Sequence, residues 1–235
     1  MTAVPAGWDG RLTIECVLAG QGIDPRSRSP LMPALVAAAR TALARAPALL
    51  KPAVGTRLLA VLAHDASGLV LDGGARIEGD GAARHLAGAT RVLLGVCTIG
   101  PDLDRESATL LPTNPVVALA LDGLGCAAVE ALAAAVQNEA RSAALLDGCE
   151  ASTRLSPGGE GWPLEAGQRT IFAALGGGGA GVRLGESGQM WPVKSVSFAL
   201  GLGRDVRHDE TAECEGCGAR ERCRWRMARE VRGGL

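Results

Sequence analysis

Tyrosine is absent from this 235-residue chain, which has only two phenylalanines and four tryptophans. A protein that stacks single-stranded nucleic acid needs a platform of aromatic rings, so the composition argues against that class. The formal net charge is also small, at −1, and gives no bulk attraction to nucleic acid or to an anionic membrane. We therefore expect neither as a partner.

Long hydrophobic runs are also missing. The longest apolar stretches, such as Val116–Leu121 and Ala131–Val136, are too short to span a bilayer. Met1–Gly10 has neither the basic region nor the apolar core of a secretory signal. These absences predict a cytoplasmic protein, and a hydrophobic content of 47% with 21% charged residues predicts a folded one.

The first half of the chain mixes predicted strands with a predicted helix. Residues 10–20 alternate loosely and predict a first strand, whereas Pro33 favours the first turn of a helix that ends near Leu50. Residues 56–98 contain β-rich runs separated by Asp-Gly and Gly-Gly turns, which predicts a small sheet.

The second half begins with the longest predicted helix, from Pro115 to about Leu146. Glu130, Gln137 and Arg141 share one face of this helix, and periodicity alone favours a solvated polar stripe. Four further elements are expected: a loop at Ser156–Gly161, a helix near 165–175, a tetraglycine connector at Gly176–Gly179, and a final strand pair near 181–184 and 193–202.

Three segments in order resemble the S-adenosylmethionine-binding activation domain of cobalamin-dependent methionine synthase, and its small stand-alone relatives more closely. They are LDGLGCAAVEALAAAVQNEAR (121–141), TRLSPGGEGWPLEAGQRTIFAAL (153–175) and VRLGESGQMWPVKSVSFALGLG (182–203). The resemblance covers about residues 85–203. It implies an α+β fold, a twisted antiparallel sheet flanked by helices, over residues 1–203, with a Cys/Arg-rich tail at 204–235.

The resemblance also implies a function in corrinoid-dependent methyl transfer. The chain would reactivate cob(II)alamin by reductive methylation with S-adenosylmethionine, or serve as a subunit of a split methionine synthase. Its partner would be a cobalamin-carrying protein or methyltransferase, with a reductase as electron source. The task of such a domain is to hold two cofactors in line.

The same resemblance implies a binding site for S-adenosylmethionine. An arginine fork can bind the ligand carboxylate, a glutamate can accept from its ammonium or ribose, and glycines let the backbone approach closely. The matching residues are Glu130, Arg154, Ser156, Pro157, Gly158 and Gly159.

One position departs from the family pattern. Gly159 stands where the family usually has tyrosine, and no tyrosine elsewhere can replace it. Trp162 or Trp191 are candidates for an aromatic surface towards the sulfonium. The other interpretation of this turn is structural, with the ligand lost.

Seven cysteines complete the inventory. Cys16, Cys97, Cys126 and Cys149 lie singly among apolar or small residues, which is typical of small buried side chains. The tail instead carries C-x2-C-x5-C in a polar context, which predicts a zinc or [4Fe–4S] site. Its ligands would be Cys214, Cys217 and Cys223, with His208, Cys149 or Cys97 as candidates for a fourth.

This tail supports two alternative functions. One is a non-catalytic module that binds a corrinoid protein and carries structural zinc. The other is an iron–sulfur electron-transfer protein that does not bind S-adenosylmethionine.

Overall fold

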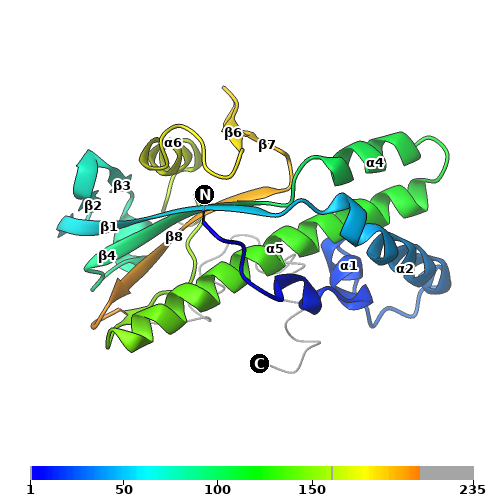
Figure 1. The fold of residues 1–235 in the computed structure, drawn as a ribbon, viewed down its shortest axis with the longest axis horizontal. Coiled ribbons are helices and arrows are strands. Elements are labelled where there is room, and N and C mark those ends of the chain that lie inside the picture. The colour runs from blue at the N-terminus through cyan, green and yellow to red at the C-terminus, as the bar shows by residue number, and fades with distance from the viewer. Residues whose placement is uncertain (1, 160, 207–235) are drawn as a thin grey trace.

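A computed structural model describes residues 2–159 and 161–206. Its centre is a six-stranded antiparallel sheet with the order β3-β2-β1-β4-β8-β5 (Figure 1). A separate two-stranded ribbon pairs β6 with β7. The strands are β1 Ala53–Asp65, β2 Gly68–Leu71, β3 Arg76–Glu78, β4 Arg91–Thr98, β5 Glu150–Ala151, β6 Arg183–Leu184, β7 Met190–Trp191 and β8 Ser195–Gly203.

Helices cover both faces of the sheet. The long helix α5 crosses one face, with α1, α2 and α4 beside it, and α6 lies over the opposite face (Figure 1). The bounds are α1 Ile14–Gly20, α2 Met32–Leu49, α3 Asp80–His85, α4 Asp102–Leu110, α5 Pro115–Leu146 and α6 Leu164–Ala174, with short 3-10 turns η1 Trp8–Arg11 and η2 Asp72–Gly74. The structure confirms the predicted α+β class.

Alternation along the central strands divides the core into two halves, because successive side chains of a strand point to opposite faces. On β8, Phe198 and Leu200 pack in the cluster beneath α5. Ala199 lies between them and packs in the cluster beneath α6, together with Trp162. We call these the α5 face and the α6 face.

The structure confirms the long helix predicted from Pro115. The side chain of Asn114 accepts a hydrogen bond from the Val117 N–H and caps the first turn, where Pro115 costs no backbone bond. By length and composition α5 could cross a membrane, yet 61% of its apolar window is buried inside the molecule. It is the core helix of this domain.

Two predictions of local structure were wrong. Residues 14–20 form helix α1 rather than a strand, and Thr13 caps its N-terminus. Packing against α5 favours the helix over the strand. The helix α1 crosses α5 at Gly20 and Gly123, and a Cβ on Gly20 would lie 2.1 Å from the Gly123 carbonyl oxygen. The expected final strand pair also does not form, since β6 pairs with β7 and β8 pairs with β4 and β5.

Two helices were not predicted at all, and the first is the short α3 within the predicted sheet region. Asp102–Leu110 forms α4, a polar helix of which Leu103 is the buried residue. Its apolar signal is therefore weak, and it is held by packing against α5 at Leu103. The predicted boundary after residue 203 lies close to the last described residues, and the tail itself lies outside them.

Candidate functional site

The structure joins the two charged residues of the predicted site. Arg154 Nη2 donates to Glu130 Oε2 in an ion pair whose side chains are 18% and 31% exposed, respectively. The Arg154 guanidinium also lies over the Phe198 ring, 5.9 Å from its centroid. Within the described part of the chain, Arg154 Nη1 is buried without a hydrogen-bond partner. A buried guanidinium N–H without an acceptor is costly, so this position favours a ligand oxygen.

The edge of the sheet positions Arg154. Beyond β5 the chain continues beside β8, where Leu155 and Ala199 exchange two backbone hydrogen bonds of 3.0 and 2.8 Å. His85 adds a hydrogen bond to the Thr153 carbonyl oxygen, with 2.8 Å between Nε2 and O. This hydrogen bond gives His85 a structural role. It fixes the backbone immediately before Arg154.

A glycine on β4 makes room for the ring under Arg154. Gly95 pairs with Phe198 across the two strands, and a Cβ on Gly95 would lie 2.4 Å from Cζ of that ring. Cys97 lies two residues further along the same face, fully buried. Burial raises the pKa of the Cys97 thiol to about 12, which the charge of Arg154 opposes and that of Glu130 reinforces. Cys97 is therefore a protonated core side chain at neutral pH.

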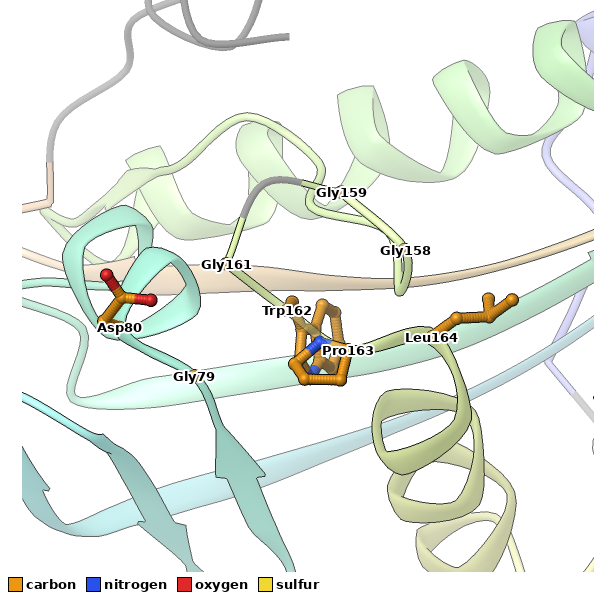
Figure 2. A pocket seen from close by; sticks show the side chains of 8 residues that line it. All are labelled: Gly79, Asp80, Gly158, Gly159, Gly161, Trp162, Pro163 and Leu164. Atoms are coloured by element: carbon orange, nitrogen blue, oxygen red, sulfur yellow. The ribbon is translucent and has the colours of Figure 1, made fainter. Parts of the chain in front are cut away.

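The Pro-Gly turn lies on the other face of the sheet. It borders an open pocket of about 410 Å³, between the N-terminal ends of α3 and α6. Figure 2 shows Asp80 at one side of this pocket and Trp162 and Pro163 near its middle. The lining residues are Gly79, Asp80, Gly158, Gly159, Gly161, Trp162, Pro163 and Leu164.

Four of the six predicted binding residues thus fall into two groups. Arg154 points to the α5 face and meets Glu130, whereas Leu155 packs on the α6 face. Gly158 and Gly159 line the pocket. Ser156 and Pro157 belong to neither group: the Ser156 carbonyl accepts from the Gly159 N–H at 3.0 Å, and Pro157 lies against α6. Successive side chains of an extended chain point to opposite faces of a sheet, so Arg154 and Leu155 face opposite sides.

The two candidate tryptophans differ in burial. Trp162 is 1% exposed and lines the pocket, and its Nε1–H has no partner among the described atoms. Trp191 is 54% exposed on the β6–β7 ribbon. Of the two candidates, Trp162 is therefore the one that lies beside the Pro-Gly turn.

The polar stripe on α5 is half-buried rather than fully solvated. Glu130, Gln137 and Arg141 all have intermediate exposure. The same face extends back to Cys126 and Asp122.

The predicted metal ligands Cys214, Cys217 and Cys223 lie outside the described residues, as does His208. Among the residues that are described, no group of three or more His, Cys, Asp or Glu side chains is placed to hold a metal ion. Of the other candidates for a fourth ligand, Cys97 is buried and Cys149 is partly exposed.

Comparison with known proteins found a solved structure with a similar fold. No family model and no curated protein matches the chain. Among solved structures, it is similar to the crystal structure of the MetH reactivation domain bound to AdoHcy, with a TM-score of 0.61 and 16% identity over 88% of this chain and 79% of that one. The chain is thus an α+β domain built on a six-stranded antiparallel sheet. In particular, it has the fold of that reactivation domain.

Proposed function

We propose that this chain is an accessory protein of corrinoid-dependent methyl transfer that binds S-adenosylmethionine at the edge of its sheet. The observation that carries the proposal is the Arg154–Glu130 pair, in which one buried guanidinium N–H is still unpaired among the described atoms. The sequence resemblance and the similar fold, found in a domain bound to AdoHcy, support it.

Arg154 and Glu130 carry opposite charges, as do the carboxylate and ammonium of an amino-acid ligand. The ligand carboxylate would take the unpaired Nη1–H of Arg154 and share the guanidinium fork with Glu130. Glu130 is the more exposed partner, so it can turn its carboxylate towards the ligand ammonium. The Phe198 ring would hold the guanidinium plane during this exchange.

The proposed reaction has two steps, an electron transfer and a methyl transfer. An external reductant would supply one electron to cob(II)alamin on the partner protein. The reduced cobalamin would then take the methyl group from the sulfonium, with release of S-adenosylhomocysteine. The residues of this chain would orient the sulfonium and leave the methyl group facing the partner. This is a positioning role, and it needs no general acid or base from the site.

Calorimetric titration with S-adenosylmethionine and with S-adenosylhomocysteine tests the proposal. Arg154→Ala should weaken binding by about 1.5–3 kcal/mol, the range for a hydrogen bond to a charged group. The matched control is Arg169→Ala, since Arg169 pairs with Glu165 in an exposed ion pair on α6. Binding that is absent in the wild type, or equal in the wild type and Arg154→Ala, would show that the turn is structural.

The finer parts of the function need their own tests. Recovery of a cobalamin-carrying protein with the tagged chain would support a corrinoid partner, and return of methylcobalamin from cob(II)alamin with a reductant would support reactivation. The two alternatives make other predictions. Stoichiometric zinc without nucleotide binding supports the interaction module, and an iron–sulfur chromophore without nucleotide binding supports electron transfer.

A further inference from the structure

A second polar cluster lies two helical turns before Glu130 on α5. Asp122 and Cys126 are one turn apart there, and Lys194 reaches both from the segment that enters β8. Its ammonium nitrogen donates to Asp122 Oδ1 at 2.5 Å and lies 3.4 Å from Cys126 Sγ. The Lys194 side chain is only 11% exposed, so its charge is less screened than that of a surface lysine.

The neighbouring helix α4 adds Asp104 to the cluster. The backbone of Val193 and Lys194 lies near its carboxylate and favours the charged form. Its Oδ2 is buried and has no partner among the atoms that the structure describes. Burial raises the pKa of Asp104, against the opposing charge of Lys194. The cluster thus brings together groups from α4, from α5 and from the start of β8.

A glycine holds Lys194 against the helix. A Cβ on Gly125 would lie 3.0 Å from both Cγ and Cε of Lys194, so glycine lets the aliphatic stem pack closely on the helix. The stem therefore packs on α5 and places the nitrogen between Asp122 and Cys126. Burial alone would lower the pKa of Lys194, but the bond to Asp122 and the charge of Cys126 raise it overall. Lys194 is therefore a cation at neutral pH.

We propose that Cys126 is a peroxide-modification site, at which the Lys194 ammonium directs oxidation of the thiol to a sulfenic acid. Reactive cysteines characteristically lie partly exposed beside a cationic side chain, and Cys126 is partly exposed. Lys194 stabilises the negative charge of the reacting sulfur and acts as the proton donor to the leaving oxygen. The site does not depend on binding of S-adenosylmethionine.

The chemistry uses one hydrogen peroxide as oxidant. The thiol proton leaves to solvent, the sulfur attacks one peroxide oxygen, and the S–O bond forms as the O–O bond breaks. The departing hydroxide takes a proton from the Lys194 ammonium and leaves as water, and solvent restores that proton. The net change is thiol plus peroxide to sulfenic acid plus water, with two electrons transferred from sulfur to the peroxide oxygens.

The test is trapping of the sulfenic acid with dimedone, after a brief treatment of the reduced full chain with hydrogen peroxide. Peptide mass spectrometry reads each cysteine separately. Lys194→Met should slow labelling of Cys126 by about tenfold, because a unit positive charge near the sulfur is lost. Lys194→Arg should restore most of the rate, and labelling of Cys16 and Cys149 should not change.

Two results would overturn the proposal. The first is a Cys126 that labels no faster than the buried Cys97 in the wild type. The second is a Lys194→Met variant that labels at the wild-type rate. If Lys194→Met loosens the fold, Cys97 will also become labelled. In that case, labelling of Cys126 in the Asp122→Asn variant tests the role of Lys194. Asp122 is 51% exposed, and its loss leaves the ammonium beside the sulfur. Labelling should stay at or above the wild-type rate, whereas a tenfold fall would assign the effect to Asp122.

Discussion

Gly95→Ala tests whether the ring beneath Arg154 is held as tightly as the structure shows. The new Cβ would lie 2.4 Å from Cζ of Phe198 and 2.7 Å from Cε2. Non-bonded carbons prefer about 3.5–4.0 Å, so the ring must move by about 1 Å or more. Phe198 is fully buried, and Arg154 lies over its ring. The displacement therefore has to be absorbed by the core or passed to Arg154.

Overpacking of this kind costs about 1–3 kcal/mol. Alanine in a strand recovers about 0.5–1 kcal/mol relative to glycine, so the net loss in the free energy of unfolding should be about 1–2 kcal/mol. For a domain of this size that lowers the melting temperature by about 2–8 °C. Thermal unfolding followed by circular dichroism measures the change. Gly10→Ala is the control, because nothing lies within 4 Å of a Cβ at that exposed position.

A double-mutant cycle identifies the cause. Gly95→Ala should cost less when combined with Phe198→Leu, because the shorter side chain removes the contact, and the coupling should exceed about 0.5 kcal/mol. A Gly95→Ala variant that melts with the wild type would refute the inferred packing. So would equal costs of Gly95→Ala in the two backgrounds, since the clash would then not involve the ring.

Three further outcomes are expected. Glu130→Gln should lower the free energy of unfolding in urea by about 1–2 kcal/mol, since it leaves the half-buried Arg154 without an opposite charge; a change within about 0.5 kcal/mol would contradict this. Burial raises the pKa of Asp104 above its ordinary 3.8, so the native state binds that proton more tightly. The wild type should therefore gain stability relative to Asp104→Asn as the pH falls from neutrality towards 3.8. A difference in unfolding free energy that does not vary with pH would contradict the raised pKa. Anaerobically purified protein should contain either zinc or iron with sulfide and a band near about 400 nm, and Cys214→Ser should abolish it; metal-free wild type would remove the predicted site.

The sequence predicted the long helix α5 and the first four strands of the sheet well, because their signals are local. Asn114 and Pro115 mark the start of α5, and turn residues separate the strands. The prediction for residues 14–20 was wrong because their alternation is compatible with a strand. The helix is favoured by its close packing on α5 at Gly20 and Gly123, which the local sequence does not show. The polar helix α4 carries too little apolar signal to be recognised.

The candidate site divides in the same way. The choice of Glu130 and Arg154 came from the motifs of the sequence, and the structure brings these two residues into contact. Sequence spacing could not show that Arg154 and the glycines of the turn face opposite sides of the sheet, because that depends on how the chain pairs with β8. It also could not associate Phe198 and Cys97 with the pair, since both read as ordinary core residues.

The sequence by itself determined where the main elements begin and end, the excess of small residues that lets α5 pack closely, and the residue types available for binding. Tertiary structure alone decided which of these residues meet. Lys194 lies 68 residues beyond Cys126 in the chain, yet the two are in contact. The physical reason is that local signals act over a few residues, whereas contacts across a sheet edge follow from strand pairing and from the glycine positions that allow close approach.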